Sequence, residues 1–224
     1  MTLTLIKDKK LEQHIYVVFS GGDDCFLIGT WEKILDLAIV IRKKFKEFQD
    51  NLREDIRFQL ENDITFSAGI VVFSPKYPML RLSEEVEEAL SASKSVAQKD
   101  SVTCFGNTVS WGEFEQSQRI ANQLIVLIGD KKEAKSLIER IKSSDIGLDK
   151  LQQDARKGRI NIPKVWRLKY YLRNVRASNR EEVGKIFEEY ENAIMNAFLK
   201  KDDRGTNPVL YPLAARWAEL FLKL

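Results

Sequence analysis

Two short apolar runs on either side of a Gly-Gly-Asp-Asp tetrapeptide constrain the fold more than any other feature. Residues Ile15–Ser20 are mostly β-branched or aromatic, and Cys25–Gly29 form a second apolar run. Gly-Gly-Asp is a favourable sequence for a tight turn between antiparallel strands. The pattern therefore predicts a β-hairpin whose turn lies at Gly21–Asp24.

The rest of the first half alternates helical and strand patterns. Apolar residues between Ile34 and Phe48 recur at three- and four-residue spacing, which predicts an amphipathic helix of about 18 residues. Further strands are predicted at Ile64–Phe73 and Ser101–Val109, with a helix from an N-cap at Ser83 to about Gln98 between them. The order strand-strand-helix-strand-helix-strand predicts an α+β fold with an antiparallel-rich sheet and helices on one face.

The second half has a different pattern and the opposite charge. Residues 1–112 contain 14 basic and 17 acidic side chains, whereas residues 113–224 contain 22 and 16. The change near Trp111-Gly112 predicts two domains, 1–112 and 113–224, the second a helical bundle. Its helices are predicted at Phe114–Ile128, Lys131–Lys142, Ile162–Val175, Arg180–Leu199 and from near Pro208 onward.

Composition narrows the possible chemistry. With one histidine and two cysteines, the chain cannot form a multi-histidine, Cys₄ or Cys₂His₂ metal site or a disulfide scaffold. Any metal site must use carboxylates, which favours Mg²⁺ or Mn²⁺. His14, at the start of the first apolar run, is expected at a surface or strand edge. No apolar run has membrane-spanning length and the N-terminus lacks a secretion signal, so we expect a cytoplasmic protein with no membrane partner.

The Gly-Gly-Asp-Asp tetrapeptide is the main candidate for a functional site. Glycines at a hairpin turn allow a phosphate to approach the backbone, and adjacent carboxylates supply the oxygen ligands that divalent cations prefer. Such cations assist phosphoryl transfer by neutralising a leaving pyrophosphate and activating a hydroxyl. The alternative is that the tetrapeptide only forms a stable turn. These residues by themselves leave both interpretations open.

A set of ordered segments resembles the large palm-domain subunit of type III CRISPR effector complexes of the Csm type. The resemblance covers about residues 15–115 and weakens beyond about residue 130, where only the helical layout is similar. The matching segments are Phe19–Trp31, Phe66–Ile70, Pro75–Pro78, Glu88–Lys94, Lys99–Gly106 and Ser110–Phe114.

The resemblance implies a ferredoxin-like palm, related to polymerase and nucleotide-cyclase palms, that joins ATP into cyclic oligoadenylates when the complex binds target RNA. It also implies other subunits of the complex, guide RNA and target RNA as partners. Carried over to this sequence, Asp23 and Asp24 would be catalytic and would hold Mg²⁺ or Mn²⁺. The remaining nucleotide-binding candidates are Ser20, Gly21, Gly22, Ser67, Lys94 and Lys99. For Ser67 a structural hydroxyl at the core edge, and for the lysines a solvated helix end, are the alternatives.

The chain departs from the family pattern at its N-terminus. Family palms begin with a strand that carries a further acidic ligand and a helix, and only 20 residues precede Gly21 here. Thr2–Ile6 could form a short strand, but Asp8 does not match the family's acidic motif. The family's nuclease domain, first palm and zinc-binding insertion are absent from this sequence. The chain therefore resembles the C-terminal part of such a subunit, and we expect it to be inactive if isolated.

Two other functions stay open. A diguanylate cyclase-like enzyme is one, although its signature continues with Glu-Phe where Asp24-Cys25 stands here. The other is a non-catalytic assembly or RNA-docking module that uses a basic segment interleaved with Trp166, Tyr170 and Tyr171. The ordinary explanation of that segment is a solvated helix face beside an aromatic core stripe. Its basic residues are Arg156, Lys157, Arg159, Lys164, Arg167, Lys169, Arg173 and Arg176.

Overall fold

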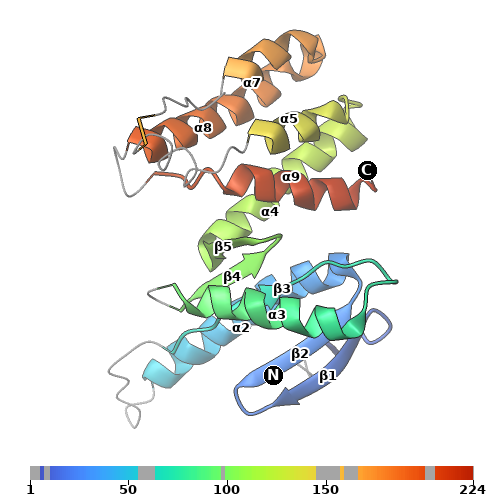
Figure 1. The fold of residues 1–224 in the computed structure, drawn as a ribbon, viewed down its shortest axis with the longest axis vertical. Helices are drawn as coiled ribbons and strands as arrows, with labels where there is room; N and C mark the ends of the chain where they lie inside the picture. Colours follow the sequence, from blue (N-terminus) through green and yellow to red (C-terminus); the bar gives the residue numbers. More distant parts are fainter. Residues whose placement is uncertain are drawn as a thin grey trace. The chain divides into compact units, whose positions relative to one another are not determined.

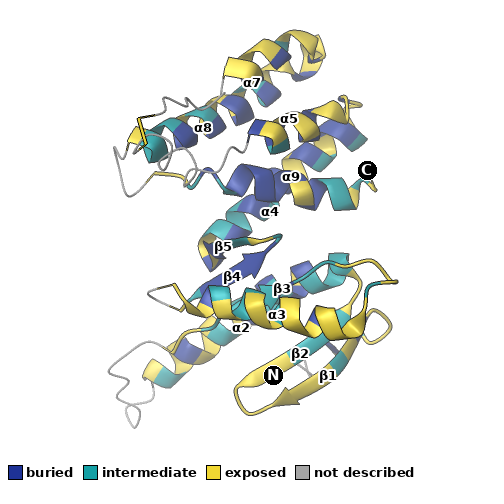
Figure 2. Cartoon of the chain, in the orientation of Figure 1, coloured by how far each residue is buried: buried dark blue, intermediate teal, exposed yellow. Residues whose placement is uncertain are grey.

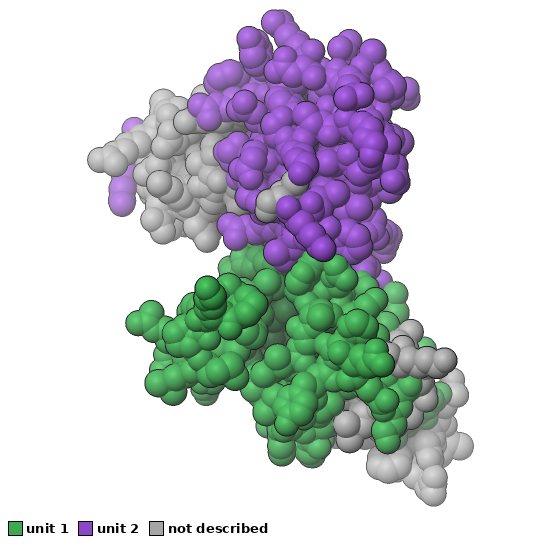
Figure 3. Space-filling model, turned by 90° about the vertical axis from the view of Figure 1, so that its right-hand side faces the viewer, with its two compact units in different colours: residues 1–111 green, residues 112–224 purple. Residues whose placement is uncertain are grey.

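The chain forms two compact units, Met1–Trp111 and Gly112–Leu224, which are coloured separately in Figure 3. A computed structural model describes residues 6–7, 11–54, 64–96, 99–144, 157–158, 166–199 and 205–223. Within those ranges the first unit combines strands with helices, and the second contains helices only. This confirms the predicted α+β fold followed by a helical domain.

The predicted hairpin is present. Strands β1 (Ile15–Gly21) and β2 (Asp24–Gly29) pair antiparallel, from Ile15 opposite Gly29 to Gly21 opposite Asp24. The register shifts between Val17 and Phe19, so that Val18 is an extra residue of the kind found in β-bulges. His14 is exposed directly before β1, as expected.

Helix α2 (Trp31–Glu54) covers one side of this hairpin (Figure 1). It is longer than predicted because residues 49–54 contain no Gly or Pro that would end a helix. Ile6 is helical rather than extended, and residues 2–5 and Asp8 lie outside the described ranges. The apolar contact between hairpin and helix centres on Ile6, Ile15, Leu37 and Ile41, with Leu11, Val17, Leu27, Ile34, Val40 and Phe66 around them.

The prediction of one antiparallel-rich sheet is wrong for the described residues, which form two sheets. The hairpin is one, and β3 (Ala68–Ile70), β4 (Ser101–Cys104) and β5 (Asn107–Ser110) form the other. β3 and β4 are parallel, whereas β4 and β5 are antiparallel. The predicted strand Ser101–Val109 is split because Phe105 and Gly106 form a two-residue turn with φ angles of 52° and 76°.

β3 is shorter than the predicted strand Ile64–Phe73 because other groups bind the backbone before it. The carbonyl of Phe66 accepts a hydrogen bond of 2.7 Å from Trp111 Nε1, and its N–H donates to Asp100 Oδ1 at 3.5 Å. The Phe66 ring stacks on Trp111, with ring centroids 5.3 Å apart. These side-chain contacts replace the ladder that a longer strand would form.

Helix α3 (Met79–Lys94) packs against β3 and β4. It begins five residues earlier than predicted, with Pro78 instead of Ser83 at the N-cap, and ends at Lys94. Ser83 is therefore not a cap: its hydroxyl donates to the carbonyl of Leu80 inside the first turns. Proline fixes φ at a value suited to a helix start, and this explains why the helix begins directly after Pro78.

The second unit contains the predicted helices with adjusted bounds. Helix α8 (Arg180–Leu199) agrees with the prediction residue for residue. The predicted helix Lys131–Lys142 starts later than expected, because Lys131–Lys135 form an irregular connection. The described part of the third predicted helix is shorter than expected: it starts at Trp166 and continues into a 3₁₀ turn. The other elements are α4 (Trp111–Gly129), α5 (Ser136–Ser144), α7 (Trp166–Tyr171), η1 (Leu172–Asn174), η2 (Ala177–Asn179) and α9 (Leu210–Phe221).

Most of the α9 helix is buried in this unit, including Leu213 and Trp217, whereas Arg216 and Phe221 are exposed (Figure 2). Phe114 lies against Trp217 with centroids 5.1 Å apart, and Tyr190 stacks on Tyr211 at 4.6 Å. Such aromatic pairs add stabilisation beyond the area that they bury. They join α4 and α8 to α9.

A buried carboxylate fastens the connection between α4 and α5. Glu133 is 4% exposed and accepts hydrogen bonds from the N–H groups of Ala134 (3.0 Å) and Arg176 (3.2 Å) and from Asn179 Nδ2 (3.0 Å). Burial by itself raises the pKa of Glu133, but these hydrogen bonds outweigh it, and the pKa lies below its ordinary value.

We expect Glu133→Gln to destabilise the second unit by about 1–3 kcal/mol at pH 7, because an NH₂ group that donates but cannot accept hydrogen bonds replaces one carboxylate oxygen. A lowered folded-state pKa gives stability that is complete above the ordinary glutamate pKa of about 4.3. That stability is lost as the pH falls through the folded-state value, so the difference between variant and wild type shrinks below about pH 4. Urea unfolding from pH 3 to pH 7 measures it, with exposed Glu188→Gln as the control. A difference that does not depend on pH would contradict the assignment.

Candidate functional site

The Gly-Gly-Asp-Asp tetrapeptide forms a two-residue hairpin turn. Gly21 pairs with Asp24, so that Gly22 and Asp23 are the two central residues. Gly22 has a φ of 61°, and a Cβ atom added there would meet no other atom within 4 Å. A positive φ at the first central position is typical of a type II′ turn. The turn is therefore open to solvent on the Gly22 side, with space for a ligand to reach the backbone.

Both aspartates at this turn are exposed. Within the described part of the chain neither Asp23 nor Asp24 forms an ion pair or a side-chain hydrogen bond. Adjacent carboxylates with no cationic partner fit the oxygen-rich coordination that Mg²⁺ and Mn²⁺ require. The described residues contain no group of three or more His, Cys, Asp or Glu that could hold a metal ion. The turn thus offers two carboxylates, and no third His, Cys, Asp or Glu of the described ranges is grouped with them.

The other nucleotide-binding candidates lie on separate elements. Ser20 is exposed and pairs with Cys25 across the hairpin. The Ser67 hydroxyl donates a hydrogen bond to the carbonyl of Lys99, whose φ is 48°. Lys94 is the last residue of α3, and its side chain is exposed like that of Lys99. The structure thus joins Ser67 to Lys99, whereas no hydrogen bond or ion pair among the described residues links them to the hairpin turn.

Sequence reasoning missed the ion pair that fixes the segment after Lys99. Arg42 Nη2 on α2 lies 2.7 Å from Asp100 Oδ2, and the other two nitrogens of the guanidinium are buried without an acceptor among the described residues. Asp100 also accepts the Phe66 N–H. The pair therefore positions both Lys99 and the start of β3. A separation of 58 residues leaves no local pattern that would predict it.

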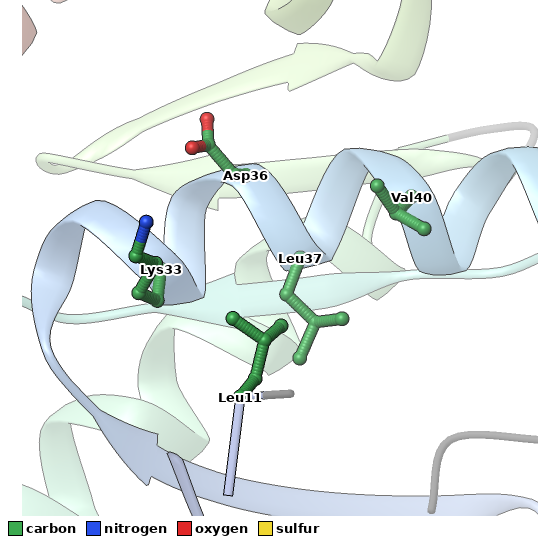
Figure 4. A pocket seen from close by; sticks show the side chains of 5 residues that line it. All are labelled: Leu11, Lys33, Asp36, Leu37 and Val40. Carbon is green, nitrogen blue, oxygen red and sulfur yellow. The ribbon is translucent and has the colours of Figure 1, made fainter. Parts of the chain in front are cut away.

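A shallow pocket of about 300 Å³ lies beside the first half of α2. In Figure 4 the side chains of Leu11 and Leu37 point toward one another. The remaining lining residues are Lys33, Asp36 and Val40. None of the predicted site residues lines this pocket. We therefore assign the candidate site to the hairpin turn because of its two adjacent carboxylates, and not because of a cavity.

The two cysteines lie in different surroundings. Both are free, Cys25 exposed and Cys104 buried in β4. Burial raises the pKa of Cys104 to about 12, which keeps its thiol protonated at neutral pH.

The basic segment of the second unit does not fully match the expected arrangement of a solvated helix face beside an aromatic core stripe. Tyr171 is buried, as a core stripe requires, but Trp166 and Tyr170 are exposed. The core-stripe interpretation is therefore wrong for these two rings. Arg156, Arg159 and Lys164 lie outside the described residues, and Lys157 is in a turn. The spacing of the apolar residues could have predicted this exposure. Leu168, Tyr171 and Val175 recur at three- and four-residue intervals and mark the buried face, which leaves Trp166 and Tyr170 on the other face.

No helix in the described part of the chain combines the length and the apolar character needed to cross a lipid bilayer.

Comparison with known proteins finds a family match over most of the first unit. The family model described as Cas10/Cmr2, second palm domain, matches residues 3–103. Three similar proteins carry the name CRISPR system single-strand-specific deoxyribonuclease Cas10/Csm1 (subtype III-A). Those from Mycobacterium tuberculosis and Enterococcus italicus are 30% identical over 114 and 112 residues, and that from Methanocaldococcus jannaschii is 27% identical over 156 residues.

These alignments cover 51%, 50% and 62% of this chain but 13%, 13% and 18% of the three relatives. The chain thus spans less than a fifth of the length of the proteins that it matches. The matched region includes all the predicted site residues, from Ser20 in β1 to Lys99 after α3. Residues 3–103 therefore resemble the second palm domain of Cas10/Cmr2 proteins, and the relatives that align with this chain are Cas10/Csm1 proteins of subtype III-A CRISPR systems.

Proposed function

We propose that the first unit is a nucleotidyl-transferase palm that joins ATP into cyclic oligoadenylates when its CRISPR complex binds target RNA. The observation that carries the proposal is the hairpin turn, where two exposed carboxylates follow two glycines in a chain that resembles the palm family. Neither a stable turn nor a stable core needs two adjacent aspartates without a cationic partner. Binding of the cations that accompany a nucleotide triphosphate would explain these two aspartates.

In this proposal each residue of the turn has a role. Asp23 and Asp24 hold Mg²⁺ or Mn²⁺, which when bound offsets the negative charge of the triphosphate. Gly22 leaves space for the phosphates, Gly21 and Ser20 line them, and Lys94 and Lys99 offer cations to them. Because its hydroxyl hydrogen is donated to Lys99, Ser67 positions the Lys99 segment and keeps only acceptor capacity for a nucleotide.

The reaction is a phosphoryl transfer. A ribose hydroxyl oxygen of one ATP forms a bond to the α-phosphorus of another, the bond from that phosphorus to pyrophosphate breaks, and the hydroxyl proton passes to solvent. The chain's own contribution is to hold the triphosphate in line with the attacking hydroxyl, which is the main requirement of such reactions. Selection of ATP over GTP rests on the family resemblance.

The relatives are named as single-strand-specific deoxyribonucleases, an activity of proteins much longer than this chain. We assign no nuclease activity to the two units described. A diguanylate cyclase-like activity is disfavoured because Asp24-Cys25 follows Gly-Gly-Asp here, where that signature has Glu-Phe. We place the protein in the cytoplasm, in a complex with the other CRISPR subunits, guide RNA and target RNA.

Manganese binding tests the turn directly in the 224-residue chain. We expect Mn²⁺ to broaden the backbone amide NMR signals of Gly22, Asp23 and Asp24 before others, because a paramagnetic ion acts at short range. Asp23→Asn/Asp24→Asn should abolish this broadening. The exposed Glu84, Glu85, Glu87 and Glu88 of α3 are an internal control, since they offer more carboxylates but no turn. Equal broadening at α3, or none at the turn, would contradict the proposed metal site.

A further inference from the structure

A stretch of the second unit contains basic residues without any acidic ones. Between residues 155 and 180 there are nine Lys and Arg and no Asp or Glu. In a chain where acidic and basic residues are otherwise nearly equal in number, this leaves a segment with strong local positive charge. The described part of it comprises α7, η1 and η2.

Helix α7 has a buried and an exposed face. Leu168 and Tyr171 point into the unit, where Tyr171 bonds Ser136 at 2.7 Å and its ring lies 6.3 Å from that of Phe187. Trp166 and Tyr170 are four residues apart and therefore share the other face. Each is 61% exposed. Two large aromatic rings at this exposure are costly in water and are typical of a binding surface.

Each exposed ring carries an arginine. The Cζ atom of Arg167 lies 5.6 Å from the centroid of the Trp166 ring, and that of Arg173 lies 5.2 Å from the Tyr170 ring. These are cation–π distances. Neither guanidinium is paired with a carboxylate among the described residues, whereas Lys169 is paired with Glu191 of α8 at 2.9 Å. The free positive charge of this face therefore lies next to the two rings.

We propose that this α7 aromatic face, formed by Trp166, Arg167, Tyr170 and Arg173, binds single-stranded RNA. Bases stack on the two rings and the guanidinium groups bind phosphates, the combination that single-strand-binding proteins use. An acidic protein segment would satisfy the arginines but would give no reason for two exposed rings beside them. The choice of RNA over DNA rests on the proposed function, in which the complex contains guide and target RNA.

Fluorescence anisotropy with a labelled 20-nucleotide oligouridine and the full 224-residue chain tests the proposal. Trp166→Ala/Tyr170→Ala should weaken binding by about 10- to 100-fold, because each stacked base is lost. Arg167→Gln/Arg173→Gln should lower the slope of log K against log salt by about 1.4, since two phosphate contacts disappear. Matched controls are Phe221→Ala and Lys185→Gln/Arg216→Gln, which change exposed residues elsewhere on the same unit. They should bind as wild type does.

Several outcomes would overturn the proposal. These are no binding by the wild-type chain, equal loss in the control variants, and tighter binding of duplex RNA than of the single strand. Binding of the deoxyuridine oligonucleotide as tight as that of RNA would overturn the choice of RNA. Binding of an acidic subunit of the complex that Arg167→Gln/Arg173→Gln weakens, with RNA binding unchanged, would make the face a protein contact.

The test is independent of the palm. Asp23→Asn/Asp24→Asn, assayed in parallel, should bind the oligouridine as wild type does, because the changes lie in the other unit. If the wild-type chain did not bind the oligouridine while the complex still made oligoadenylates, this inference alone would be refuted. Absent synthesis with intact RNA binding would refute the proposed function alone.

Discussion

Replacing both aspartates of the hairpin turn, Asp23→Asn/Asp24→Asn, is expected to reduce oligoadenylate production by the assembled complex at least about 10³-fold. Removal of a single group that stabilises transition-state charge already costs about 10²–10³-fold, and here both proposed cation ligands are lost. Asparagine keeps the size of each side chain and is well tolerated in turns, so the hairpin should persist. The measurement is chromatographic detection of products from ATP after target RNA is added.

The control for this variant is Asp50→Asn, which removes an exposed carboxylate from α2 in the same unit. It should leave product formation unchanged. Target-RNA binding and the thermal unfolding of both variants should match those of the wild type, because the two aspartate side chains form no hydrogen bond or ion pair among the described residues. Unchanged production by Asp23→Asn/Asp24→Asn would reject the catalytic role of the turn and favour an assembly module.

The largest effect on stability is expected at Gly69 in β3. A Cβ atom at this position would lie 2.5 Å from the backbone nitrogen of Leu90 and 2.9 Å from the carbonyl carbon of Ala89. Both belong to α3, so the helix backbone would have to move away from the sheet. Overpacking of this kind costs about 1–3 kcal/mol, and we expect at least about 3 kcal/mol for Gly69→Val.

Hydrogen exchange of peptides from each unit measures this effect where it occurs. Gly69→Val should accelerate exchange in β3, β4 and α3 and leave the second unit unchanged. The matched control is Gly184→Ala in α8, where an added Cβ would meet nothing within 4 Å. It should slow exchange in that unit, because alanine favours a helix by about 1 kcal/mol over glycine. Similar exchange for Gly69→Val and wild type would contradict the close packing of α3 on β3.

Local patterns in the sequence predicted much of this protein. The hairpin, helix α8 and the start of α9 follow from apolar spacing and turn residues over short distances, which is the range in which such patterns are reliable. The two acidic residues of the turn were found in the same way, because their chemistry depends on adjacent residues. The count of one His and two Cys was enough to exclude multi-histidine, Cys₄ and Cys₂His₂ metal sites and a disulfide scaffold within this sequence.

Contacts between residues far apart in the sequence determined the features that local patterns did not predict. Parallel pairing of β3 with β4 joins residues more than 30 positions apart, and the Arg42–Asp100 pair spans 58, so no local pattern carries them. Trp166 and Tyr170 have the composition of a core stripe, and only packing against α5 and α8 determines which face of α7 is buried. Sequence determines the chemistry available at a turn, whereas burial depends on which surfaces meet in three dimensions.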